Sequence, residues 1–311
     1  MHRQEHIKTM ERIQKAISRA KEEQSLNDLA PLSHSGRNHS GREMPVSPGG
    51  LSSSGLSSSG LSSSGLASSG FASSATGPMS FADLELLPTS LATLQANRII
   101  NFTRGTHYSA AFDMLRTKIM RDLLASDWQT LLVTSPTAGC GKTVTAINLA
   151  ISMARQPETQ VCLIDLDLRR PSVAASLGIS PPANLTDALD GVVTAERCFF
   201  GIDIVGPNLA LAANLRPAQQ SVETLLSRQM QELLNSLRNA SPRPILIFDM
   251  PPVLSCDDVL AFLPQIDCSI LCVAEGHSTI KEIENSQKLL SETNFLGCVL
   301  TKSTERVQTY Y

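Results

Sequence analysis

The chain has few aromatic residues, little charge and no long apolar run. Aromatic residues make up 4% of it, charged residues 18%, and the net charge is -3. Nucleic-acid binders usually carry a strong excess of Lys and Arg, so this balance argues against nucleic acid as a partner. No run approaches the roughly 20 apolar residues that span a bilayer, and the amino terminus lacks a signal-peptide core. We therefore expect a cytoplasmic protein that reaches the plasma membrane only through a partner.

Cysteine is absent from the first 139 residues, and all seven cysteines lie from Cys140 onward. An odd number without regular spacing argues against a disulfide framework. Cys268 and Cys272 are expected on one face of a strand, but no second ligand pair lies nearby to make a metal site. We interpret the cysteines as small buried apolar residues of a protein in a reducing compartment.

The first 107 residues contribute little to a hydrophobic core. Apolar residues at helical spacing predict an amphipathic helix over 1–23. Because a lone helix of this length is marginally stable in water, three alternatives are open: it docks on a protein or on another copy, it frays in solvent, or it lies on a membrane surface. The segment 24–107 begins with low complexity, including three LSSSG repeats from residue 51. Gly and Ser bury too little apolar surface to offset their ordering entropy, so we predict a disordered, flexible linker that ends in a transitional segment.

From residue 108 the pattern changes to apolar strands that alternate with amphipathic helices. Strands are expected at 131–134, 161–164, 202–205, 245–248, 269–273 and 298–300. Helices are expected at 109–125, 142–155, 222–237 and 279–293. This alternation indicates an α/β fold with a mostly parallel sheet and helices on both faces. We predict one such domain over 108–311, with its site at the carboxyl ends of the strands.

A glycine-rich segment, SPTAGCGKT at 135–143, follows the first of these strands and opens a helix. That is the setting of a P-loop, in which backbone N–H groups and the helix amino terminus bind polyphosphate. Lys142 is expected at the β- and γ-phosphates of ATP and the Thr143 hydroxyl on Mg²⁺. Pro136 stands where the usual pattern has its first glycine. The residues expected to contact nucleotide are Gly139, Cys140, Gly141, Lys142, Thr143 and Val144.

Two later strands end in aspartate. Asp165 and Asp167 lie in DLDLRRP at 165–171, and Asp249 begins DMPP at 249–252. Alternate residues of a strand point to the same face, so Asp165 and Asp167 are expected on the same side. Carboxylates beside a phosphate loop suit Mg²⁺, while the alternative for each is a capping or solvated aspartate. The adjacent Arg169 and Arg170 contact phosphate or a neighbouring subunit, or they are surface charge; the sequence leaves both readings open.

In this order the three motifs resemble the bacterial tyrosine kinases, which are P-loop kinases of capsule and exopolysaccharide export. LRTKI at 115–119 matches as well, and the similarity covers about residues 108–311. The resemblance implies an ATP-dependent protein-tyrosine autokinase that regulates polysaccharide synthesis. It implies that Lys142 and Thr143 bind phosphate and Mg²⁺, and that Asp167 and Asp249 hold or position the metal. It makes Asp165 the base for an incoming tyrosine hydroxyl.

The resemblance also implies partners. Tyr310 and Tyr311 would accept phosphate from a neighbouring copy in a ring, and a separate membrane protein would be the activator. Three features depart from the family pattern. The tyrosine tail is reduced to these two residues, and Thr301 replaces an asparagine that often contacts adenine. The oligomerisation motif keeps Arg116 but has Ala110 and Asp113 at its other positions.

Two other functions are compatible with these residues. ATPases of chromosome partitioning and division-site selection share the fold, but they carry an extra lysine where this chain has Thr137. A nucleotide-binding scaffold that has lost kinase activity would explain the short tyrosine tail. The presence of Lys142, Thr143, Asp165, Asp167 and Asp249 argues against such a scaffold.

Overall fold

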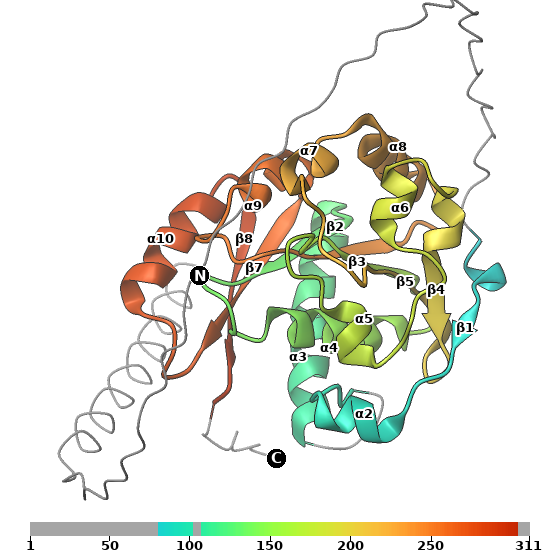
Figure 1. Ribbon diagram of the computed structural model, residues 1–311. Helices are drawn as coiled ribbons and strands as arrows, with labels where there is room; N and C mark the ends of the chain where they lie inside the picture. Colours follow the sequence, from blue (N-terminus) through green and yellow to red (C-terminus); the bar gives the residue numbers. More distant parts are fainter. Residues whose placement is uncertain (1–79, 102–106, 304–311) are drawn as a thin grey trace, which may run out of the picture.

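A computed structural model describes residues 80–101 and 107–303, without the side chains of His107 and Tyr108. The predicted amphipathic helix, most of the predicted linker, and Tyr310 and Tyr311 lie outside the described residues. Within those residues, no helix combines the length and apolar character needed to cross a bilayer. Figure 1 shows a single twisted sheet with helices on both of its faces.

The sheet has eight strands in the order β1-β4-β5-β3-β6-β2-β7-β8. Their bounds are β1 Leu86–Leu87, β2 Thr130–Thr134, β3 Val161–Asp165, β4 Phe199–Ile202, β5 Gly206–Ala212, β6 Ile245–Asp249, β7 Cys268–Ala274 and β8 Asn294–Thr301. Every neighbouring pair is parallel except β4 and β5. The predicted α/β fold with a mostly parallel sheet is confirmed.

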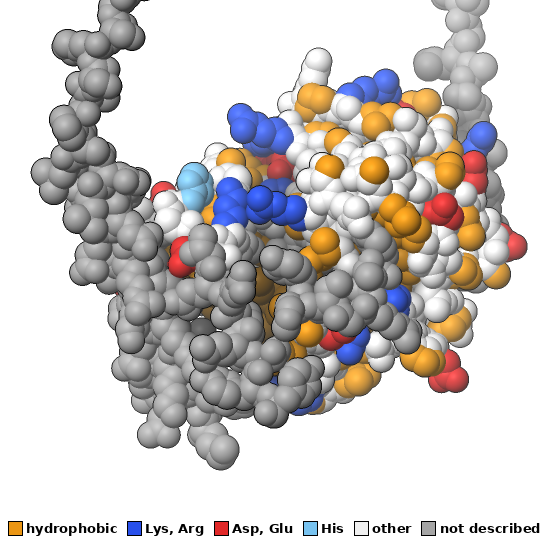
Figure 2. Space-filling model, turned by 90° about the horizontal axis from the view of Figure 1, so that it is seen from below, with side chains coloured by type: hydrophobic (Ala, Val, Ile, Leu, Met, Phe, Trp, Pro, Cys, Tyr) orange, Lys and Arg blue, Asp and Glu red, His pale blue; other side chains and the backbone are white. Residues whose placement is uncertain are grey.

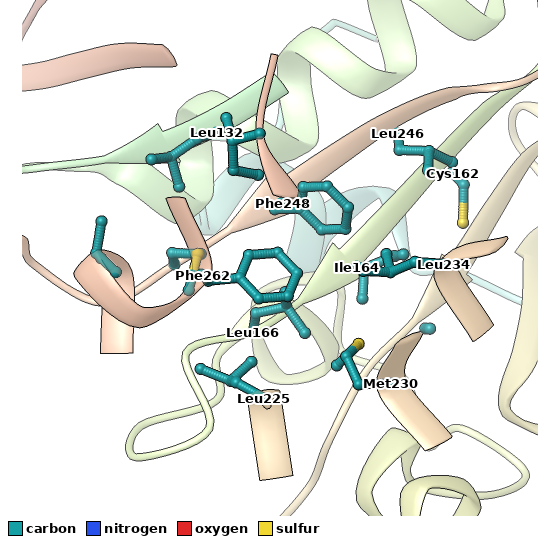
Figure 3. Packing of buried hydrophobic residues seen from close by; sticks show 14 of the residues in the cluster. Leu132, Cys162, Ile164, Leu166, Leu225, Met230, Leu234, Leu246, Phe248 and Phe262 are labelled. Atoms are coloured by element: carbon teal, nitrogen blue, oxygen red, sulfur yellow. The ribbon is translucent and has the colours of Figure 1, made fainter. Parts of the chain in front are cut away.

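Successive strand residues point to opposite faces, so the sheet has two cores. On β2, Leu132 belongs to one core, and Leu131 and Val133 belong to the other. Helices α6 (Leu185–Leu189), α7 (Ser221–Leu225), α8 (Arg228–Arg238), α9 (Asp258–Phe262) and α10 (Ile280–Leu290) cover the first core. Helices α2 (Leu91–Ala96), α3 (His107–Ser126), α4 (Lys142–Ala154) and α5 (Val173–Leu177) cover the second. Figure 3 shows the first core, where the rings of Phe248 and Phe262 meet edge to face at 5.3 Å.

Three short 3₁₀ helices, η1 (Phe81–Asp83), η2 (Ala195–Cys198) and η3 (Leu263–Gln265), complete the described elements. The strand predicted at 202–205 is wrong. There β4 ends at Ile202, a turn follows, and β5 returns antiparallel to it. The predicted helix at 222–237 is interrupted after α7. The Ser227 side chain accepts the N–H of Met230 and starts α8 as a separate helix.

The segment 80–101, here called the strap, belongs to the domain although the sequence predicts a boundary at residue 108. Its strand β1 pairs parallel with β4 at the sheet edge, and Leu94 and Ile99 are fully buried. The side-chain oxygen of Asn148 on α4 accepts the N–H groups of Ile100 and Asn101 at 2.8 and 3.0 Å. The strap therefore packs on the helix that follows the phosphate loop.

Candidate active site

The phosphate loop connects β2 to α4. Gly139 and Gly141 have φ angles of +80° and +79°, which side chains with a Cβ rarely adopt. Gly141 is the N-cap of α4 and provides no side-chain hydrogen bond to the helix start. The first N–H groups of α4 and the positive end of its dipole are thus available to an anion. This is the backbone arrangement that binds phosphate.

Lys142 places its ammonium group between the acidic ends of β3 and β6. Its Nζ lies 2.9 Å from Asp167 Oδ2 and 3.3 Å from Asp249 Oδ1. The hydroxyl of Thr143 donates to Asp249 Oδ2 at 2.6 Å. Asp165 is the parallel-strand partner of Asp249. The structure thus brings together the predicted residues of all three motifs.

Burial and charge act in opposite directions on Lys142. Burial alone lowers the pKa of its amine, but the charges of Asp249 and Asp167 outweigh burial, and the pKa is raised. Burial also raises the pKa of Asp249, and it raises that of Asp165 to about 8, with the charge of Asp249 as a second cause. Two of the three acidic side chains, Asp167 and Asp249, contact the Lys142 ammonium group, and Asp165 is close enough to add to its pKa shift.

The donor set fits Mg²⁺, which prefers hard oxygen ligands. Thr143 offers a hydroxyl, and Asp167 and Asp249 offer carboxylates that are 4% and 0% exposed. Among the residues that the structure describes, no group of three or more His, Cys, Asp or Glu forms a ready-made metal cage. Mg²⁺ in phosphate-transfer sites usually keeps several waters and takes one or two carboxylates, so the few donors present suffice.

Asp165 has different partners from the other two carboxylates. It is fully buried. Its Oδ2 accepts the N–H groups of Ser172 and Val173 at 2.9 and 3.0 Å, and its Oδ1 accepts that of Asp167 at 3.3 Å. These bonds fix the loop from β3 to α5, which carries Asp167. The role of Asp165 as a base stays a prediction, because a tyrosine hydroxyl would have to replace one of these N–H groups.

The structure gives different surroundings to the two arginines that the sequence left open. Arg169 forks onto Asp258 of α9, with its NH2 group 2.8 Å and its Nε 3.1 Å from Oδ1. Asp258 is fully buried, so Arg169 compensates a buried charge. Arg170 is exposed, and its guanidinium has no partner among the described residues. Figure 2 shows one face of the domain, on which Lys and Arg side chains occur at several separate places, some of them beside acidic ones.

Arg116, which the resemblance links to contact between subunits, forms hydrogen bonds within the chain. On α3, NH1 of Arg116 lies 2.7 Å from Asp113 Oδ1 and 3.2 Å from the hydroxyl of Ser152 on α4. Ser152 also donates to Asp113 at 2.7 Å. Asp113, which departs from the family pattern, is thus the internal partner of Arg116.

Three side chains contact the phosphate loop in ways that the sequence did not predict: His277 and Ser278 were not identified, and Thr301 was expected only near adenine. His277 Nε2 lies 3.0 Å from the carbonyl oxygen of Ala138, and Ser278 Oγ lies 3.4 Å from Cys140 Sγ. The hydroxyl of Thr301 donates to the carbonyl of Cys140 at 2.7 Å. For His277 and Ser278 the signal in the sequence was their position after β7, and for Thr301 it was the family resemblance at the end of β8.

Comparison with known proteins relates the chain to nucleotide-binding domains and to tyrosine-protein kinases. The model of the CobQ/CobB/MinD/ParA nucleotide binding domain family matches residues 131–310. The tyrosine-protein kinase YwqD of Bacillus subtilis is 26% identical over 62% of this chain and 80% of its own length. The tyrosine-protein kinase CpsD of Streptococcus pneumoniae is 30% identical over 57% of this chain and 78% of its own length. Against the tyrosine-protein kinase etk of Escherichia coli K12, at 26% identity, the match spans only 27% of that protein.

Solved structures share the fold. The VpsO kinase domain superposes with a TM-score of 0.54 and 27% identity, covering 62% of this chain and 94% of that one. The chimerical protein CapA2B2 gives a TM-score of 0.59 over 70% of this chain and 94% of that one, and at 23% identity the likeness concerns the fold alone. The chain therefore belongs to the bacterial tyrosine-protein kinases, within the CobQ/CobB/MinD/ParA nucleotide-binding domain family.

Proposed function

We propose that the chain is an ATP-dependent protein-tyrosine kinase that phosphorylates Tyr310 and Tyr311 of another copy of itself. One observation carries the proposal: Lys142 lies between Asp167 and Asp249 at the start of α4, beside the Thr143 hydroxyl. The relatives YwqD and CpsD, named as tyrosine-protein kinases, support it.

The site residues divide the work of phosphoryl transfer. N–H groups from Gly139 to Thr143 and the Lys142 ammonium group bind the phosphates of ATP. The raised pKa of Lys142 keeps its charge at neutral pH, where it stabilises charge on the transferred group. Thr143, Asp167 and Asp249 hold Mg²⁺, which neutralises charge on the β- and γ-phosphates when bound.

In the reaction, the tyrosine oxygen forms a bond to the γ-phosphorus while the bond from that phosphorus to the bridging oxygen of ADP breaks. The phenolic proton leaves to a carboxylate, and we assign this role to Asp165. Burial and the charge of Asp249 raise the pKa of Asp165, so its carboxylate binds a proton more tightly than an exposed aspartate does. To act, it exchanges one backbone N–H partner for the incoming hydroxyl.

The family resemblance supports a setting for this activity as well. We propose that the kinase regulates capsule or exopolysaccharide synthesis, and that a membrane activator protein recruits it from the cytoplasm. Arg170, exposed beside the Asp167 loop, is available to a partner.

The test is to incubate the purified chain with Mg-ATP, with and without the cytoplasmic peptide of a candidate activator, and to map phosphate by intact mass and peptide analysis. Phosphate on Tyr310 or Tyr311 is expected. Lys142→Ala should lower the rate roughly a hundredfold or more, because it removes charge stabilisation at the transferred group. Lys281→Ala, at an exposed position on α10, is the matched control and should leave the rate unchanged.

Mixing two variants tests transfer between copies. A Tyr310→Phe/Tyr311→Phe chain keeps the site, and Lys142→Ala keeps the acceptors, so only the mixture should yield phosphotyrosine. ATP hydrolysis without tyrosine phosphate, even with the activator, would contradict the kinase and favour a nucleotide-dependent switch.

A further inference from the structure

Thr301 ends β8 and lies against the phosphate loop. Its hydroxyl donates to the carbonyl of Cys140 at 2.7 Å, and the carbonyl of Val273 is 3.2 Å from the same oxygen. A Cβ built on Gly141 would lie 3.6 Å from both Cβ and Oγ1 of Thr301. Thr301 therefore bonds to Cys140 and lies beside Gly141, and these two residues immediately precede α4.

These contacts determine where the loop's N–H groups point. In a trans peptide the C=O and the following N–H point in opposite directions. Because Thr301 binds the carbonyl of Cys140, the N–H of Gly141 points away from Thr301. His277 acts in the same way on the peptide that joins Ala138 to Gly139. Its Nε2 lies 3.0 Å from the carbonyl oxygen of Ala138, so the N–H of Gly139 points away from His277.

The two peptides end at the two glycines with positive φ, whose backbone has the most freedom to turn. Without a partner for the Cys140 carbonyl, the peptide between Cys140 and Gly141 would be free to rotate, and the N–H of Gly141 would no longer point in a fixed direction. A hydroxyl at residue 301 removes that freedom before any nucleotide binds, and such preorganisation increases affinity.

We propose that Thr301, supported by His277, is a positioning residue that holds the phosphate loop in its nucleotide-receiving form and thereby sets nucleotide affinity. This inference rests on the proposed function in taking Mg-nucleotide as the ligand. The proposal places the end of β8 at the phosphate-binding part of the site, whereas the family resemblance links residue 301 to adenine.

The experiment is a calorimetric titration of the full chain with Mg-ADP. Thr301→Val keeps the shape and removes the hydroxyl, so affinity should fall roughly threefold to tenfold, which corresponds to one lost hydrogen bond. Thr301→Ser keeps the hydroxyl, and its affinity should stay within about twofold of wild type. His277→Ala, at an exposed site, should weaken binding by about twofold to fivefold and tests the same idea if Thr301→Val folds poorly.

Thr293→Val is the matched control. The Thr293 hydroxyl, at the opposite end of β8, lies 2.7 Å from Ser269 Oγ and donates to the Leu290 carbonyl at 2.9 Å. Its loss should lower thermal stability about as much as Thr301→Val does, and leave Mg-ADP affinity unchanged.

Wild-type affinity in both Thr301→Val and His277→Ala overturns the proposal. So does Thr301→Ser binding as weakly as Thr301→Val, or Thr293→Val losing affinity to the same extent. A wild-type chain that binds no Mg-ADP overturns the proposed function and this inference together. A wild-type chain that binds Mg-ADP but forms no phosphotyrosine removes only the kinase, and the comparison of the Thr301 variants still decides the inference.

Discussion

Arg169 and Arg170 are adjacent in sequence, yet only Arg169 compensates a buried charge. Replacing Arg169 with Ala leaves Asp258 fully buried with the Ser221 hydroxyl as its remaining side-chain partner. We expect the free energy of unfolding to fall by about 1–3 kcal/mol, toward the lower end because the Arg169 side chain is itself half exposed. Arg170→Ala should stay within about 0.5 kcal/mol of wild type. Urea unfolding of both variants measures the two free energies of unfolding. Equal losses would show that the hydrogen bonds from Arg169 to Asp258 do not stabilise the fold.

The site residues that could be predicted from the sequence combine a chemically typical residue type with a position beside a glycine-rich loop or at the end of an apolar strand. Lys142 and Thr143 open the helix after a glycine-rich loop, and Asp167 and Asp249 follow apolar strands. Thr301 and His277 could not be predicted in their observed contacts, because they bond to backbone carbonyls of a segment more than a hundred residues away in sequence. Such bonds leave no pattern of residue types.

Among the secondary-structure elements, the junction of α5 with the strap gives a sharp prediction. Gly178 ends α5 with a φ of +68°, and a Cβ there would lie 2.6 Å from Cγ2 of Thr93 on α2. Gly178→Ala should therefore lower the free energy of unfolding by more than the roughly 1–2 kcal/mol that a left-handed backbone costs a non-glycine residue.

Two further variants separate the causes of that loss. Gly191 has a φ of +72°, and a Cβ added there would have nothing within 4 Å, so Gly191→Ala measures the backbone cost alone. Adding Thr93→Ala to Gly178→Ala should recover part of the loss by removing the clash. Urea unfolding of the variants gives the comparison, and a Gly178→Ala chain no less stable than Gly191→Ala would show that α2 moves aside freely.

Strands and helices were predictable where they are long and apolar, and less so elsewhere. The sequence missed β5 because Gly206, Pro207 and Asn208 open it and alanines alternate with leucines after them, which gives a weak strand signal. The pairing of β5 with β4 that buries this strand is a tertiary contact. The break between α7 and α8 depends on the cap at Ser227, which a continuous helical pattern conceals.

For the whole molecule, the strap decides where the domain begins. Leu94 and Ile99 pack in the same core as α3 and α4, and they were missed because the strap is short and its few apolar residues show no sustained period. Asn148 joins the strap to α4 with both parts of its amide, since its nitrogen donates to the Arg98 carbonyl at 3.0 Å. The helix that opens at Lys142 is thus covered by residues preceding the predicted boundary.

A chain that starts at residue 108 should therefore be much less stable than one that starts at residue 80. It loses burial of Leu94 and Ile99, worth about 1.5–3 kcal/mol each, and it leaves the Asn148 amide without its strap partners. The loss is a large part of the roughly 5–15 kcal/mol that stabilises a typical domain, so low soluble yield and unfolding at lower urea are expected. The 80–311 chain should unfold within about 1 kcal/mol of the full chain, because the segment it lacks is rich in Gly and Ser. If the 108–311 chain unfolds at the same urea concentration as the 80–311 chain, the strap is only an accessory and the domain begins where the sequence pattern changes.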